Sequence, residues 1–169
     1  QYYKSFMEWG MDGEVNTFLE EVFFWLAENI PSSSNPKKLC WGDSRIGNVL
    51  FEDFQVKSLL DWEMATIGDP LCDLAWGLTT DDVSSHGLNI EKLSGTISND
   101  EAIKFWEKRT GFSAEHFFYY RILCLFKFSV IMIRVAKKLI HSEIMPLDSD
   151  FHVNNHVSNY LKQEFNENN

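Results

Sequence analysis

A short polar loop and one carboxylate beyond it carry side chains whose types fit phosphoryl transfer. The loop lies between two apolar runs and contains Asp43, Arg45 and Asn48, and Asp61 ends the next apolar run. Transfer of a phosphoryl group to a hydroxyl needs a carboxylate that orients and deprotonates the acceptor. It also needs oxygen ligands for the Mg²⁺ that neutralises the phosphate oxygens. These four side chains supply the carboxylate and the oxygen ligands that the reaction needs, together with one cation.

The spacing of these residues predicts a role for each. Asp43 and Asn48 stand five positions apart. The base Asp and the metal-binding Asn of the protein-kinase catalytic loop have the same spacing, and a further metal-binding Asp follows them. We therefore predict Asp43 as the catalytic base, and Asn48 and Asp61 as the residues that bind Mg²⁺. Arg45 is predicted to reach the transferred phosphate with its planar fork of donors.

Two of these residues also have structural explanations. Asp43 would be a turn residue in many loops, and Asn48 a turn or strand-edge amide. We favour the chemical roles because Asn48 and Asp61 follow Asp43 where the mechanism requires them. A carboxylate that ends an apolar strand, such as Asp61, is costly without a counter-charge, and Mg²⁺ would supply one.

The role of Arg45 depends on its acidic neighbours. An ion pair with Glu63 or Asp69 is the structural alternative to a contact with phosphate. Glu63 lies two residues after Asp61, on the same face if the strand continues. It is therefore either a third metal ligand or a partner that only holds Arg45.

Short apolar and β-branched runs predict a small sheet that positions this loop. The expected strands are Lys38–Trp41, Asn48–Phe51 and Val56–Asp61. Residues 52–55 would turn the last two strands into a hairpin. Such a sheet would present Asp43 and Asp61 on neighbouring loops that face one site.

The rest of the chain is predicted to be mostly helical. Apolar periodicity and capping signals predict helices over Glu14–Asn29, from Asp69-Pro70 onward, from Ser98 to Thr110, from Ser113 to His141 and over Phe151–Glu164. The polar stretch from Thr79 to Ser98 is predicted to be irregular. The helix ending at His141 is apolar almost all round. Its charged residues must therefore reach a rim or find acidic partners: Arg121, Lys127 and Arg134.

Two longer segments resemble a known family. The segments are Trp-Gly-Asp-Ser-Arg-Ile-Gly-Asn-Val-Leu-Phe, from Trp41, and Leu-Asp-Trp-Glu-Met-Ala-Thr-Ile-Gly-Asp-Pro-Leu-Cys-Asp-Leu-Ala-Trp, from Leu60. They are similar to the aminoglycoside phosphotransferase family of kinase-like small-molecule kinases. The resemblance is greatest to the branch fused to, or encoded beside, acyl-CoA dehydrogenases. The family usually has His before the Gly-Asp pair, and here that place holds Trp41.

This resemblance implies a fold and a domain organisation. It implies a predominantly helical α+β fold, the C-terminal lobe of a protein-kinase-like enzyme, with a small β-hairpin sheet carrying the catalytic loop. Residues 1–169 would form this lobe as a single domain, with the N-terminal nucleotide-clamping lobe absent from the chain. Asp73 would support the catalytic loop from behind, whereas its position in a first helical turn is also explained by the helix dipole.

The resemblance also implies an activity. The expected reaction is transfer of the γ-phosphoryl group of ATP, with Mg²⁺, to a hydroxyl of an aminoglycoside-like or hydroxyacyl substrate. As a lone catalytic lobe the chain would be inactive without its partner lobe. The alternative, motivated by Trp41 and the missing lobe, is a non-catalytic kinase-like module that binds a ligand or a protein.

The net charge and the cysteines of the chain indicate which kinds of partner and which cellular compartment to expect. The net charge of −10 argues against nucleic acid or an anionic membrane as the partner, since both attract basic patches. The three cysteines, at 40, 72 and 124, lack paired spacing and predict buried thiols in a reducing compartment. No apolar run is long enough to span a bilayer. We therefore expect a cytoplasmic protein.

Overall fold

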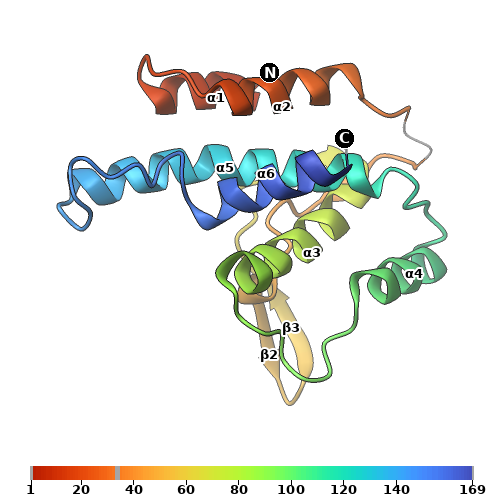
Figure 1. Cartoon of the computed structure of the whole chain (residues 1–169). Helices are drawn as coiled ribbons and strands as arrows, with labels where there is room; N and C mark the ends of the chain where they lie inside the picture. Colours follow the sequence, from red (N-terminus) through yellow and green to blue (C-terminus); the bar gives the residue numbers. More distant parts are fainter. Residues whose placement is uncertain (1, 33–34, 169) are drawn as a thin grey trace. The chain divides into compact units, whose positions relative to one another are not determined.

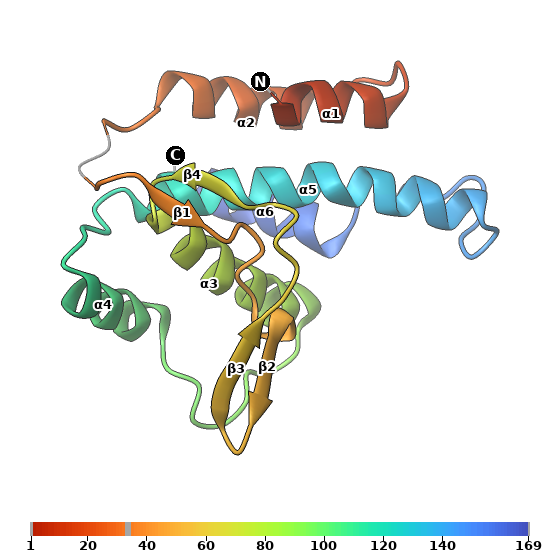
Figure 2. The ribbon, with the colours of Figure 1, turned by 180° about the vertical axis from the view of Figure 1, so that it is seen from behind.

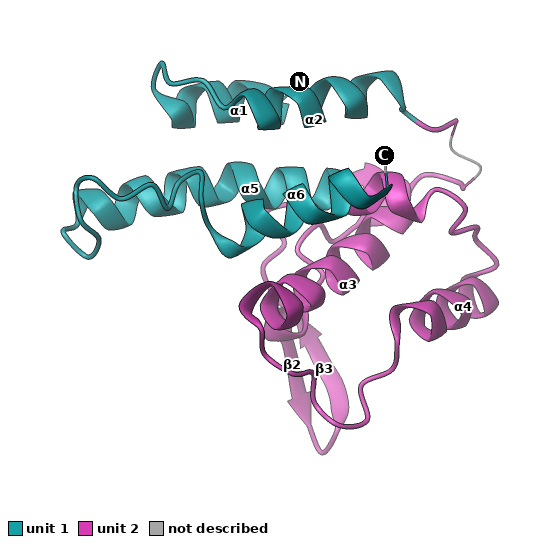
Figure 3. Ribbon diagram, in the orientation of Figure 1, with its two compact units in different colours: residues 1–30, 122–169 teal, residues 31–121 magenta. Residues whose placement is uncertain are grey.

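The computed structural model describes residues 2–32 and 35–168 (Figures 1 and 2). These residues form two compact units, which Figure 3 distinguishes by colour. One unit comprises residues 31–121, and the other comprises residues 1–30 and 122–169. Most of the described elements are helices and the strands are short, so the predominantly helical α+β class is confirmed.

The strands of the unit of residues 31–121 form two antiparallel pairs, where the sequence predicted a single sheet. Strand β1 (Lys38–Cys40) pairs with β4 (Thr66–Gly68), and β2 (Val49–Glu52) pairs with β3 (Gln55–Leu59). The three strands predicted from the sequence are confirmed to within two residues. Strand β4 was missed because three residues are too few to show an alternating pattern.

The turn between β2 and β3 lies at residues 52–55, as predicted. Its central residues Asp53 and Phe54 have φ angles of 50° and 60°. Two positive φ angles match the twist of a two-residue hairpin, although this turn contains no glycine. The hairpin fixes the relative register of the segments that precede Asn48 and follow Leu59.

Helix α3 (Leu71–Ser85) follows β4, and the short helix η2 (His86–Leu88) extends it. The side chain of Asp69 accepts a hydrogen bond from the Leu71 amide at 2.9 Å, which confirms the predicted start. The prediction of an irregular chain from Thr79 was wrong up to residue 88. Thr79, Thr80 and neighbouring residues are buried, and the Thr80 hydroxyl donates to the Trp76 carbonyl oxygen at 2.8 Å. Burial and this bond outweigh the low helix propensity of threonine.

A buried polar cluster joins the end of α3 to three other segments of the same unit. The Asp82 carboxylate accepts hydrogen bonds from Lys92, Asn99 and Arg121, each at 2.7 Å. Burial by itself would raise the pKa of Asp82, but the bonds from Lys92 and Arg121 together hold it below its usual value. The acidic partner expected for Arg121 is therefore Asp82.

Helix α4 (Asn99–Thr110) begins and ends as the sequence predicts. The Ser98 hydroxyl accepts a bond from the Glu101 amide, and the Glu101 carboxylate accepts one from the Ser98 amide. Gly111 ends the helix with a φ of 73°, a conformation that glycine adopts without strain.

Helix α5 (Phe117–His141) begins four residues later than predicted. The segment around Ser113 is held to Asn35 instead: the Ser113 amide donates to Asn35 Oδ1 at 2.8 Å, and Asn35 Nδ2 donates to the Ser113 carbonyl oxygen at 2.8 Å. A partner far away in the sequence thus decides where the helix starts.

Residues 1–30 and 122–169 form a helical unit. It contains α1 (Tyr2–Met11), α2 (Thr17–Glu28), most of α5 and the final helix α6 (His156–Asn168). In Figure 1, α6 runs back antiparallel to α5. Helix α6 begins later than predicted because Asn155 caps it, with Oδ1 accepting bonds from the amides of Val157 and Ser158.

The remaining charges of α5 find aromatic partners. Lys127 lies 5.3 Å from the ring centre of Tyr3, and Arg134 lies 3.7 Å from that of Trp9. The sequence predicted a rim position or an acidic partner for each of these cations, and the contacts with aromatic rings were not foreseen. None of the described helices has the length and apolar character needed to cross a membrane.

Candidate active site

The loop between β1 and β2 folds over a second loop through a glycine. Gly42 has a φ of 91°, and a Cβ atom at this position would overlap the backbone carbonyl of Met64. A side chain here would therefore be strained and would also push apart the two loops that carry Asp43 and Asp61. The close approach of the two loops thus accounts for a glycine at position 42.

Helix α3 holds the Asp43 loop in place through Asp73. The two carboxylate oxygens of Asp73 accept bonds from the backbone amides of Trp41 at 2.7 Å and Gly42 at 2.8 Å. The Ser44 hydroxyl donates to the Asp73 carbonyl oxygen at 2.6 Å. Of the two explanations for Asp73, support of the loop is therefore confirmed.

Three donors hold the carboxylate of Asp43. Trp76 Nε1 donates to Oδ1 at 2.7 Å, Asn48 Nδ2 donates to Oδ2 at 2.6 Å, and Arg45 Nε donates to Oδ2 at 3.1 Å. The Asp43 side chain is 13% exposed. The carboxylate is thus fixed in one orientation while part of it still faces solvent. Sequence reasoning missed Trp76, whose only signal is its place one helical turn after Asp73.

Asn48 is buried at the end of the short helix η1 (Ile46–Asn48). Its amide nitrogen also donates to the Asp43 carbonyl oxygen at 3.0 Å, so both amide hydrogens are directed at Asp43. Within residues 2–32 and 35–168, no donor is bonded to Asn48 Oδ1. This orientation leaves an amide oxygen available to a cation.

Asp61 is tied to the same loop through the residue before it. The Leu60 amide donates to the Asn48 carbonyl oxygen at 2.8 Å, and Trp41 Nε1 donates to the Leu60 carbonyl oxygen at 2.7 Å. Asp61 itself has a φ of 60°, and its side chain is exposed. The structure therefore brings the backbone of Asp61 next to that of Asn48.

Trp41 occupies the place where a histidine was expected. Besides its bond to Leu60, its ring packs against Trp62, with ring centres 6.0 Å apart. Trp41 therefore links the start of the Asp43 loop to both neighbours of Asp61.

Arg45 pairs with Asp43 through Nε. Neither alternative partner holds it among the described residues: Asp69 binds Asn35 and the Leu71 amide, and Glu63 has no ion pair. Glu63 is exposed and follows Asp61 in the loop. Its part in metal binding stays a prediction.

The donor set fits a magnesium ion. No three His, Cys, Asp or Glu side chains gather into a metal cluster in the part of the chain that the structure describes. Mg²⁺ does not require such a cage, because it is usually held by one or two carboxylates, with water and phosphate oxygens completing its shell. The Asn48 amide oxygen and the Asp61 carboxylate are ligands of that kind.

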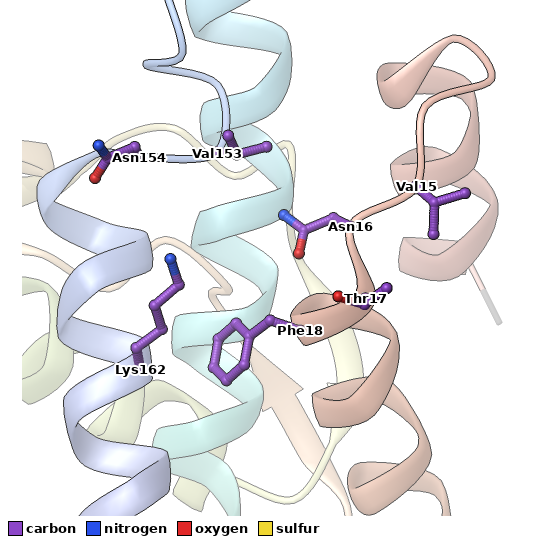
Figure 4. A pocket seen from close by; sticks show the side chains of 7 residues that line it. All are labelled: Val15, Asn16, Thr17, Phe18, Val153, Asn154 and Lys162. Atoms are coloured by element: carbon purple, nitrogen blue, oxygen red, sulfur yellow. The ribbon is translucent and has the colours of Figure 1, made fainter.

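The helical unit contains an open hollow of about 510 Å³ between the start of α2 and α6 (Figure 4). Seven residues line it: Val15, Asn16, Thr17, Phe18, Val153, Asn154 and Lys162. In Figure 4 the Phe18 ring points toward α6, and Lys162 Nζ lies 5.9 Å from its centre. This lining contains no carboxylate, so the hollow lacks the residue type that the reaction expected from the sequence needs as a base.

Known proteins share this sequence and fold. The chain is 34% identical over 106 residues to acyl-CoA dehydrogenase family member 11 of Gallus gallus, and 41% identical over 59 residues to that of Homo sapiens. These matches cover 56% and 34% of the chain, but only 14% and 8% of the relatives. The chain thus spans a small part of the length of the curated relatives it matches.

A solved structure shares the fold. A crystal structure assigned as an aminoglycoside phosphotransferase, from Ralstonia eutropha, superposes with a TM-score of 0.73 at 18% identity. The superposition covers 96% of this chain and 50% of the other. The sequence model of the phosphotransferase enzyme family (APH) matches residues 7–102, which include the whole Asp43 loop and Asp61. The chain therefore belongs to the phosphotransferase enzyme family, and its fold is kinase-like.

Proposed function

We propose that this chain is the catalytic lobe of a phosphotransferase that uses ATP and Mg²⁺ to phosphorylate a hydroxyl of a small molecule. The observation that carries the proposal is the arrangement around Asp43. Its carboxylate is held by Trp76, Asn48 and Arg45, while the Asn48 amide oxygen is left to a cation. A turn carboxylate would not need three donors from three separate positions.

In this mechanism Asp43 acts on the acceptor hydroxyl. The hydroxyl donates to the Asp43 carboxylate, which orients the oxygen for in-line attack on the γ-phosphorus. As the new O–P bond forms, the bond between phosphorus and the β,γ-bridging oxygen breaks, and ADP leaves. The hydroxyl proton passes to Asp43, so charge and atoms balance.

Asn48 and Asp61 would hold the magnesium ion, with Glu63 as a further candidate. When bound, the ion neutralises charge on the β- and γ-phosphate oxygens. The exposed position of Asp61 suits a ligand that meets a metal–nucleotide complex arriving from solvent. The bonds through Leu60 keep Asp61 beside Asn48 before that complex binds.

Arg45 would contact the transferred phosphate. Its bond to Asp43 uses Nε, and no Nη atom is bonded among the described residues. The two terminal nitrogens are therefore free to form a bidentate pair with phosphate oxygens. The guanidinium would then compensate charge on the phosphoryl group as it moves.

The substrate is proposed by class only. The chain's similarity to acyl-CoA dehydrogenase family members favours a hydroxyacyl compound over an aminoglycoside-like one. A second, N-terminal lobe, as the resemblance implies, would clamp the nucleotide. The non-catalytic alternative gains no support from Trp41, whose indole maintains the link between the two site loops.

Calorimetric titration of Mg²⁺ with a non-hydrolysable ATP analogue tests the proposal. We expect binding by the chain and its loss in Asp61→Asn. Asp53→Asn is the matched control, because Asp53 is also exposed with a positive φ but lies at the hairpin tip. Absence of binding by the unaltered chain, or equal loss in both variants, would contradict a metal–nucleotide site on this lobe.

A further inference from the structure

We infer that Trp76 is a positioning residue for Asp43: its indole N–H binds Oδ1 and fixes the orientation in which the carboxylate meets the acceptor hydroxyl. The inference rests on the proposed function. It starts from the bond of 2.7 Å between Trp76 Nε1 and Asp43 Oδ1. Trp76 lies 33 residues after Asp43 in the sequence and is only 4% exposed.

The chemistry of indole makes this donor permanent. An indole nitrogen donates a hydrogen bond and cannot accept one, so it cannot take up the proton that Asp43 receives. Its bond to a carboxylate is charge-assisted and stronger than a bond between neutral groups. Because Trp76 is buried, solvent cannot replace it at Oδ1.

The other carboxylate oxygen has one replaceable donor. A carboxylate oxygen offers two lone pairs, and those of Oδ2 are taken by Asn48 at 2.6 Å and Arg45 at 3.1 Å. The Asn48 side chain is buried, whereas that of Arg45 is 53% exposed. An incoming hydroxyl would therefore meet either the second lone pair of Oδ1, beside the bond from Trp76, or Oδ2 after displacing Arg45, whose guanidinium would then be free to contact phosphate.

The same helix also sets the backbone of the loop. Asp73 lies one turn before Trp76 on α3 and binds the amides of Trp41 and Gly42. A Cβ atom at position 77 would lie 2.8 Å from the Ser44 carbonyl oxygen, so Gly77 lets the loop approach the helix. One face of α3 thus fixes both the backbone beside Asp43 and its carboxylate.

Indole resonances in ¹H–¹⁵N NMR spectra test the bond directly. The six tryptophans can be assigned by single replacement with Phe. We expect the Trp76 indole N–H far downfield, and we expect it to move upfield in Asp43→Asn while the Trp106 indole stays in place. Glu63→Gln is the control for loss of a nearby negative charge. A Trp76 resonance with the same chemical shift in the Asp43→Asn variant would overturn the inference.

Trp76→Phe separates positioning from packing, because it keeps a buried ring but removes the donor. We expect the Asn48 side-chain amide and Arg45 Nε–H signals to move, since Asp43 is no longer held from Oδ1. We expect the affinity for Mg²⁺ with the ATP analogue to change by less than about twofold, because Asn48 and Asp61 remain. Unchanged Asn48 and Arg45 signals would mean that Trp76 only fills the core.

The two proposals fail in different ways. Without nucleotide binding by the unaltered chain, the proposed function fails even if the Trp76 resonance responds to Asp43. With nucleotide binding but no such response, the function stands and the positioning role of Trp76 is wrong.

Discussion

The indole nitrogen of Trp41 lies 2.7 Å from the carbonyl oxygen of Leu60, which joins the start of the catalytic loop to the residue before Asp61. A Trp41→Phe variant should weaken binding of Mg²⁺ with an ATP analogue by about fivefold, since a hydrogen bond contributes about 1 kcal/mol. Calorimetry measures this change. Trp41→His should recover part of the affinity because imidazole offers a ring N–H. Trp106→Phe, on α4, is the control, and an equal loss there would refute the prediction.

Replacement of Asp73 by Ala should destabilise the unit of residues 31–121. The amides of Trp41 and Gly42 would lose their acceptor, and an unsatisfied buried donor costs about 1–3 kcal/mol. We expect the free energy of unfolding in urea to fall by roughly 3 kcal/mol. Asp148→Ala, at an exposed site, should change it by less than about 0.5 kcal/mol. Similar values for the two variants would argue that Asp73 does not hold the loop.

Gly42→Ala should abolish metal–nucleotide binding, because the new methyl group would separate the two loops at Met64. Gly95→Ala provides a close control: Gly95 has a φ of 89°, near the 91° of Gly42, but no atom lies within 4 Å of an added Cβ. The control should show only the cost of the backbone conformation, about 1 kcal/mol. Urea unfolding and calorimetry on both variants would separate the two effects, and intact binding by Gly42→Ala would disprove the close approach.

The Asp82 cluster should make the protein sensitive to acid. Burial opposes the charge of Asp82, but the bonds from Lys92 and Arg121 hold its pKa below the ordinary 3.8. A lowered pKa in the folded state gives stability that is present above about pH 4 and is lost as the pH falls through the folded value. The free energy of unfolding, measured in urea from about pH 2 to 7, should therefore decrease below about pH 4.

The matching variant for this prediction is Asp82→Asn. It removes the Asp82 charge that pairs with the buried Arg121 and should cost about 3 kcal/mol at neutral pH. Its stability should also depend less on pH in the acid range, below about pH 4. A variant with the same acid dependence as the unaltered chain would assign the effect to other carboxyl groups.

Much of the candidate site could be predicted from the sequence because its residues are close along the chain. Asp43, Arg45 and Asn48 lie in one loop, and their spacing is enough to predict a common site. The capping box at Ser98 and the stop at Gly111 were predictable for the same reason. Local residue types determine a turn or a helix end largely by themselves.

Tertiary structure alone decided the contacts between distant segments. Trp76 reaches Asp43 across 33 positions, and Arg121 reaches Asp82 across 39. The sequence required a partner for Arg121 but could not select one, because many acidic residues satisfy the same charge rule. No local pattern indicates the role of Trp76, since a buried tryptophan looks the same in sequence whether its N–H binds a carboxylate or a carbonyl. The packing of α3 against the Asp43 loop determined that the Trp76 N–H binds a carboxylate.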